Sequence, residues 1–121
     1  MNTNPRTTKV LGESGEKQAC DFLIRRGYKI FENNFRHKHF EIDIIALDEK
    51  EDEVVFVEVK TRSKKGFGET EAQVSQQQLA RIGVAAEVYL EKKRLNKCFR
   101  FDIINILPGK IEQFKNVTAQ W

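Results

Sequence analysis

The segment Val54-Val55-Phe56-Val57-Glu58-Val59-Lys60 constrains the fold of this chain more than any other. Its β-branched and aromatic residues favour a strand over residues 54–61. The apolar run ends not in a turn but in a carboxylate and an ammonium group two positions apart. Since residues i and i+2 of a strand point to the same face, Glu58 and Lys60 are predicted to project side by side.

A second strand is predicted over residues 40–47, Phe40-Glu41-Ile42-Asp43-Ile44-Ile45-Ala46-Leu47. The charged linker over residues 48–53 is typical of a solvated turn between antiparallel partners. Pairing of the two strands would bring Asp43 close to Glu58, with Lys60 beside them. Two carboxylates buried together need compensation, which either a cation or Lys60 would provide.

Metal-dependent phosphodiester hydrolysis is the chemistry expected of such a site. Mg²⁺ keeps several waters and needs only one or two carboxylates, and Mn²⁺ suits the same oxygen ligands. Asp43 and Glu58 are the predicted metal ligands, with the Val59 carbonyl as a further oxygen. Lys60 would hold the attacking water or neutralise developing charge. The simpler alternative is a solvent-exposed ion pair between Glu58 and Lys60, worth ~0–1 kcal/mol.

The remaining chain predicts a mixed α/β sheet flanked by helices, in the order α-β-β-β-α-β. Residues 1–9 are predicted to be a flexible lead-in, and residues 10–121 a single domain. Asn33-Asn34 is expected to end the first strand, and Pro108-Gly109 the last long one. A short edge strand is expected over residues 111–114. The predicted helices and longer strands cover residues 13–26, 28–32, 40–47, 54–61, 75–93 and 99–107.

Composition narrows the class of protein without choosing a function. With 40% hydrophobic and 32% charged residues in 121 positions, the chain is long enough for one packed core. It has no apolar run of about 18 residues, so no transmembrane helix is expected. The expected location is the cytoplasm, and the two cysteines are expected to be free thiols. A net charge of +3 permits contact with phosphate but does not require it.

Polar residues outside the two central strands supply further candidates. Glu16 shares the apolar stripe of the first predicted helix, where a metal ion or Lys60 would compensate it; the alternative is a carboxylate that favours the helix dipole. Asp102, close to Arg100, is expected to form a structural ion pair.

The predicted nucleic-acid contacts are Arg36, Lys38, Arg62, Lys64, Lys65 and Gln78. Gln78 opens the second helix and is equally consistent with a solvated side chain.

An ordered set of motifs resembles the YraN family, small bacterial proteins assigned to the PD-(D/E)xK nuclease superfamily. The motifs are Gly15-Glu16, Asn34-Phe35-Arg36, Glu41-Ile42-Asp43-Ile44-Ile45-Ala46, Phe56-Val57-Glu58-Val59-Lys60-Thr61-Arg62 and Arg100-Phe101-Asp102. The resemblance implies a restriction-endonuclease-like core, similar to that of archaeal Holliday junction resolvases. It also implies that Asp43, Glu58 and Lys60 are the catalytic triad and that Glu16 joins the metal site.

Two positions depart from the family pattern: Phe40 stands in place of a glycine and Gln78 in place of a lysine. The expected function is a Mg²⁺-dependent endonuclease acting on DNA, structured or branched rather than of defined base sequence, in a protein that could cut as a homodimer. The alternative is a non-catalytic nucleic-acid-binding or assembly protein on a nuclease scaffold.

Overall fold

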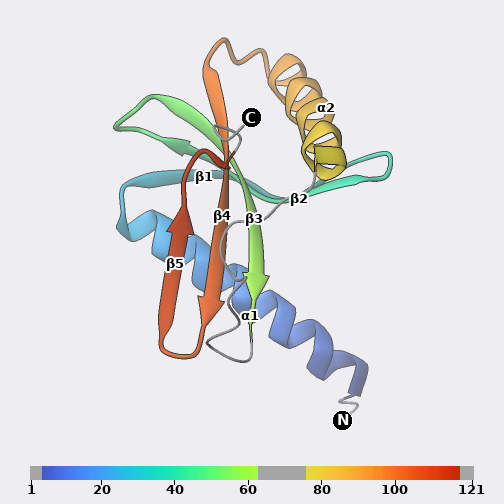
Figure 1. The fold of residues 1–121 in the computed structure, drawn as a ribbon, viewed down its shortest axis with the longest axis vertical. Helices are drawn as coiled ribbons and strands as arrows, with labels where there is room; N and C mark the ends of the chain where they lie inside the picture. The colour runs from blue at the N-terminus through green and yellow to red at the C-terminus, as the bar shows by residue number, and fades with distance from the viewer. Residues whose placement is uncertain (1–3, 63–75, 118–121) are drawn as a thin grey trace.

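The computed structural model describes residues 4–62 and 76–117. Two helices and five strands follow one another in the predicted order, with the short edge strand added at the end (Figure 1). Two of the predicted nucleic-acid contacts, Lys64 and Lys65, lie outside the described residues. The elements are α1 (Asn4–Arg25), β1 (Tyr28–His37), β2 (Phe40–Asp48), β3 (Glu53–Thr61), α2 (Gln76–Lys92), β4 (Cys98–Leu107) and β5 (Lys110–Phe114).

The strands form one mixed sheet in the order β1-β2-β3-β4-β5. All neighbours are antiparallel except β3 and β4, which are parallel and are joined by the connection that contains α2. Parallel strands need such a crossover connection. The sequence predicts this connection, because the predicted helix over residues 75–93 separates the strands over residues 54–61 and 99–107. The mixed sheet flanked by helices is therefore confirmed.

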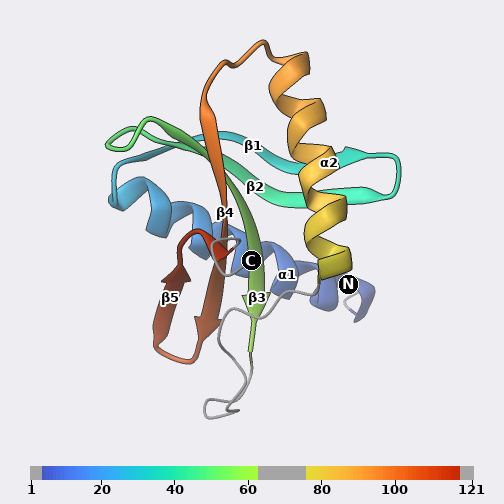
Figure 2. The same ribbon diagram turned by 45° about the horizontal axis from the view of Figure 1, so that its top comes forward.

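The two helices cover opposite faces of the sheet and divide its core into two clusters (Figure 2). On one face, Ala19 and Leu23 of α1 pack against the sheet. On the other, Leu79, Ala86 and Tyr89 of α2 do so, which confirms the apolar stripe predicted for the second helix. Within the described residues, neither helix is long and apolar enough to cross a membrane, and both cysteines are free thiols.

Two boundaries differ from the prediction. β1 continues through Asn33-Asn34 to His37 with its register to β2 unchanged from Glu32 onward, while Asn34 adopts a φ of 53°. Asparagine tolerates this left-handed conformation better than most residues. α1 begins at Asn4, so residues 4–9 of the predicted lead-in are helical. Pro5 falls in the first turn, where a missing backbone N–H breaks no helical hydrogen bond.

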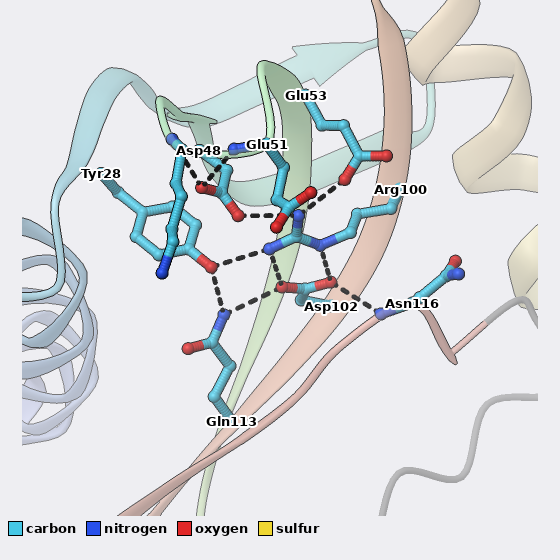
Figure 3. A network of polar contacts seen from close by, with 9 residues as sticks. Tyr28, Asp48, Glu51, Glu53, Arg100, Asp102, Gln113 and Asn116 are labelled. Atoms are coloured by element: carbon cyan, nitrogen blue, oxygen red, sulfur yellow. Dashed lines mark hydrogen bonds and ion pairs between the residues drawn. The ribbon is translucent and has the colours of Figure 1, made fainter.

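A buried guanidinium ties the strands together at one end of the sheet (Figure 3). The Arg100 side chain is only 6% exposed. Its Nε and Nη2 donate to the two carboxylate oxygens of Asp102 at 3.0 and 3.2 Å. Its Nη1 donates to Asp48 and Glu53 at 2.9 and 2.8 Å, and Nη2 also donates to the Tyr28 hydroxyl at 2.7 Å. The predicted ion pair between Arg100 and Asp102 is thus confirmed.

The network extends beyond Arg100 to the last strand and the segment that follows it. Gln113 donates to the Tyr28 hydroxyl and to Asp102, and the Asn116 backbone N–H donates to Asp102 at 2.9 Å.

The prediction of a solvated turn over residues 48–53 was wrong at its first residue, because Asp48 is buried against Arg100. Burial alone would raise the pKa of Asp48, but hydrogen bonds and charge from Arg100 lower it overall.

Removal of Arg100 should destabilise the fold strongly, because the two buried carboxylates of Asp48 and Asp102 would lose their compensating charge. We expect Arg100→Met to lower the free energy of unfolding by about 3–5 kcal/mol, as measured by urea denaturation. Arg36→Met is the matched control, since Arg36 forms an exposed 3.5 Å ion pair with Glu41 and should cost no more than about 1 kcal/mol. Equal losses in the two variants would contradict this role for Arg100.

Candidate active site

Asp43 lies where β2 and β3 separate. The last registered pair between these strands at this end is Ile44 with Val57. Beyond it, the Val59 backbone N–H donates to Asp43 Oδ2 at 2.8 Å. A side-chain carboxylate therefore takes the place of the carbonyl that a continuing strand would offer to this N–H. This bond fixes the carboxylate at the mouth of the fork between the strands.

The alternation of β2 is broken at the same position. Ile42 packs into the cluster that faces α2, whereas Ile44 packs into the cluster that faces α1. In a regular strand both would point to one face. Asp43 therefore lies between the two helical layers, close enough to Glu16 of α1 for its charge to act on the Asp43 carboxyl.

Glu58 is held by two donors. Lys60 Nζ lies 3.1 Å from Glu58 Oε2, and both side chains are 23% exposed. The predicted side-by-side projection of these two residues is confirmed, and the pair is partly buried rather than fully in solvent. Gln78 Nε2 donates to Glu58 Oε1 at 2.8 Å. The first turns of α2 are thus connected directly to the end of β3.

A cavity of about 210 Å³ opens over these residues. Asp43, Glu58, Glu41 and Gln78 line it together with apolar side chains. Glu41, Ile42 and Asp43 are consecutive in β2 and all line this cavity, which agrees with the broken alternation of the strand. A second cavity of about 180 Å³ shares Glu41, Glu58 and Gln78 with the first and is bounded by Phe40. Phe40 is thus a wall of a cleft that remains open.

Burial and the neighbouring negative charges of the cleft disfavour the ionised form of Asp43. The pKa of Asp43 is raised from 3.8 to about 6, chiefly by burial, and the hydrogen bond from the Val59 N–H opposes this rise. The negative charges of Glu16, Glu58 and Glu41 add to it. A cation beside Asp43 would relieve both the repulsion and the loss of solvation.

Gly15 allows α1 to approach β3 closely and so places the next residue, Glu16, near the fork. A Cβ built on Gly15 would lie 2.6 Å from Thr61 Oγ1, closer than real contacts allow. Glu16 is half-buried. With its amide nitrogen turned toward the helix, Asn34 donates to Glu16 at 3.2 and 3.3 Å. Sequence reasoning took Asn34 for a strand break and did not identify this contact.

The predicted phosphate-binding residues are spread over two regions. Arg36 and Lys38 belong to the β1–β2 hairpin, where Arg36 pairs with Glu41 at 3.5 Å and Lys38 adopts a φ of 57°. Arg62 follows β3, and its backbone N–H donates to the Ile106 carbonyl at 2.9 Å. Lys64 and Lys65 lie outside the described residues.

The carboxylate oxygens of the cleft are of the kind that bind a hydrated hard cation such as Mg²⁺. Over residues 4–62 and 76–117, no group of three or more His, Cys, Asp or Glu side chains is arranged to hold a metal ion. Asp43 and Glu58 nevertheless line one cavity. Mg²⁺ binds through one or two carboxylates while keeping several waters, so these residues fit such an ion.

The raised pKa of Asp43 predicts a pH-dependent effect on stability. Between the ordinary value of 3.8 and about 6, the folded protein binds more protons than the unfolded one, so stability falls as the pH rises through this window. Asp43→Asn retains an oxygen acceptor for Val59. Without divalent metal, we expect it to be about 1–2 kcal/mol more stable than wild type at pH 7.5, with no difference near pH 4.

Urea denaturation across this pH range provides the measurement. Asp21→Asn is the control, because the Asp21 side chain is 47% exposed and pairs with Lys17 four positions earlier on the helix surface; it should change stability by less than about 0.5 kcal/mol. A loss of stability in Asp43→Asn at pH 7.5 would argue against an uncompensated carboxylate.

The close approach of Gly15 and Thr61 can be tested by a double-mutant cycle. In wild type, Gly15→Ala should destabilise the protein by about 1–3 kcal/mol, because the added methyl group clashes with Thr61 Oγ1. In a Thr61→Ala background the nearest atom is the Thr61 Cβ, at 3.9 Å. There, Gly15→Ala should stabilise the helix by up to about 1 kcal/mol. Equal effects in the two backgrounds would show that the contact does not limit the approach of α1.

Comparison with known proteins places the chain in a bacterial family. Residues 15–106 match the model of a family described as "Uncharacterised protein family UPF0102". A UPF0102 protein of Geobacter metallireducens is 42% identical over 111 residues, covering 90% of this chain and 89% of the relative. A UPF0102 protein of Trichlorobacter lovleyi is 39% identical over 100 residues, covering 82% and 78%. The chain therefore belongs to the UPF0102 family.

Proposed function

We propose that the protein is a divalent-metal-dependent nuclease that hydrolyses phosphodiester bonds in DNA, with Asp43, Glu58 and Lys60 as its catalytic residues. The observation that carries the proposal is the fork between β2 and β3. There, Asp43 accepts a hydrogen bond from the Val59 N–H and lines one cavity with Glu58. The buried negative charge at this point calls for a cation.

Mg²⁺ or Mn²⁺ would be held by Asp43 and Glu58, with the Val59 carbonyl and Glu16 as further oxygen donors. When bound, such an ion supplies a polarised water and neutralises charge on the phosphate. Lys60 Nζ lies 3.1 Å from the Glu58 carboxylate, which gives Lys60 two proposed roles. It orients that carboxylate, and it offers a positive charge to the phosphoryl oxygens. Gln78 holds the other oxygen of Glu58.

The element order and the parallel β3–β4 pair support a restriction-endonuclease-like core, in keeping with the resemblance to the YraN proteins. Contacts with the DNA backbone are proposed for Arg36, Lys38, Arg62, Lys64 and Lys65. Such contacts position a substrate without reading its base sequence. A structured or branched DNA is therefore the proposed substrate.

Cleavage of both strands of a junction would require two active sites, and a homodimer would supply them. Two large apolar side chains, Val84 of α2 and Phe99 of β4, are 47% and 41% exposed. Singly exposed apolar residues are common on protein surfaces, so the proposed homodimer rests on the need for two active sites. The oligomeric state is thus part of the proposal and is measurable by light scattering.

One observation favours the second candidate, a nucleic-acid-binding or assembly module without turnover. Both carboxylate oxygens of Glu58 accept hydrogen bonds from the chain itself, one from Lys60 and one from Gln78. Glu58 is therefore compensated without a metal ion. In such a module the cleft would bind phosphate but would not activate water.

Cleavage assays distinguish the two candidates. Labelled single strands, duplex, flap and four-way junction would be incubated with the protein in Mg²⁺ and in Mn²⁺. We expect cleavage by wild type, and a loss of at least about 100-fold in Asp43→Asn because the metal-bound water is no longer held. DNA binding should survive or tighten, since a negative charge facing the phosphates is removed.

Asp21→Asn again serves as the matched control and should retain full activity. Equal cleavage by wild type and Asp43→Asn would indicate a contaminating nuclease and would overturn the assignment of Asp43. Binding without cleavage on every substrate would favour the non-catalytic module. Divalent ions should also raise the melting temperature of wild type more than that of Asp43→Asn, which tests metal binding independently of turnover.

A further inference from the structure

The outer part of the cleft contains residues that the proposed reaction does not use. The 180 Å³ cavity is lined by His39 and Phe40 of the β1–β2 hairpin region and by Arg81 of α2. It shares Glu58 and Gln78 with the inner cavity. The two cavities therefore form one cleft: Asp43 lines its inner part, Glu41 and Glu58 line both parts, and Arg81 and Phe40 line its outer end.

Arg81 is placed to hold a phosphate next to the candidate active site. It is exposed and forms no ion pair with any residue in the described ranges. It follows Gln78 by three positions, so the two share a face of α2. Because Gln78 contacts Glu58, Arg81 lies about one helical turn beyond the residue that holds Glu58 and lines the outer part of the same cleft.

Phe40 supplies an aromatic wall at the same end. It packs partly against the core that faces α2 and still lines the cavity. Its ring centroid lies 6.5 Å from that of His37, with the planes tilted by 37°. Aromatic side chains in grooves of this kind stack on unpaired bases. A base inside a duplex is already stacked on its neighbours and cannot offer its face to Phe40.

We propose that the outer cavity is a subsite for one unpaired nucleotide adjacent to the scissile phosphodiester, with Arg81 at its phosphate and Phe40 against its base. The position of the scissile bond in this inference rests on the proposed function. The substrate class becomes a single strand, or the unpaired arm of a branched nucleic acid, rather than continuous duplex.

Binding measurements without divalent metal test the subsite separately from catalysis. Fluorescence anisotropy would compare a labelled single strand with a hairpin duplex of the same composition, over a range of salt concentrations. All variants would carry Asp43→Asn. Arg81→Ala is matched by Lys92→Ala, an exposed charge loss at the far end of the same helix. Phe40→Leu is matched by Phe99→Leu, a partly exposed phenylalanine on β4.

We expect the single strand to bind more tightly than the duplex. Arg81→Ala should weaken single-strand binding about fivefold or more and reduce the slope of log K against log salt by about 0.7. Phe40→Leu should weaken single-strand binding at least about fivefold and leave duplex binding nearly unchanged. Both control variants should stay within about twofold of the parent. If circular dichroism shows that Phe40→Leu is unfolded, Arg81→Ala still tests the subsite, because Arg81 is exposed and its replacement should not affect folding.

Several results would overturn the subsite: a preference for duplex, no binding to either oligonucleotide, or Arg81→Ala behaving like Lys92→Ala. The outcome is also distinguishable from that of the proposed function. If wild type cuts DNA but these variants do not differ from their controls, the subsite alone is wrong. If the expected binding pattern is found and wild type cuts nothing in Mg²⁺ or Mn²⁺, the subsite stands and the nuclease assignment fails.

Discussion

Charge compensation by Arg100 is the interaction on which the rest of the fold depends. One guanidinium bonds Asp102 of its own strand, Asp48 and Glu53 at the two ends of the β2–β3 turn, and Tyr28 at the start of β1. It thereby fastens four of the five strands at one end of the sheet. A planar group with five donors can satisfy several carboxylates at once, so the end that carries most of the buried charge is also the end that is held most tightly.

The opposite end of β3 has a different balance of charge. Asp43 and Glu58 meet there with Lys60 as the cation beside Glu58, and the charges of Glu16 and Glu41 raise the pKa of Asp43 further. The contrast with the Arg100 network has a physical meaning. At one end the chain neutralises its own carboxylates, which favours stability. At the other it leaves Asp43 undercompensated, which costs stability and creates a place for a cation. Residues whose ionisation is perturbed in this way gather at functional sites.

Much of the fold could be predicted from pattern. The apolar run over residues 54–57 and the apolar stripe of α2 each have one straightforward interpretation, and the structure agrees with them. The charged linker before the run is exposed except at its ends, where Asp48 is buried and Glu53 partly buried against Arg100. The site was predictable as far as Glu58 and Lys60, because a two-residue spacing in a strand has a fixed geometric consequence. Asn34 was not predictable in the same way. Its residue type favours a turn, yet Asn34 stays within β1 with a positive φ, and its amide lies against Glu16.

The sequence by itself determined the order of the elements, the faces that they bury and the pair of charges at the end of β3, because these follow from local periodicity. Only the tertiary structure decided which distant groups meet. The hydrogen bond from Val59 to Asp43, the close approach of Gly15 to Thr61 and the contact of Gln78 with Glu58 all join different elements. Such contacts depend on how strands separate and how near helices pack, and neither quantity is encoded in the spacing of residues along a single element.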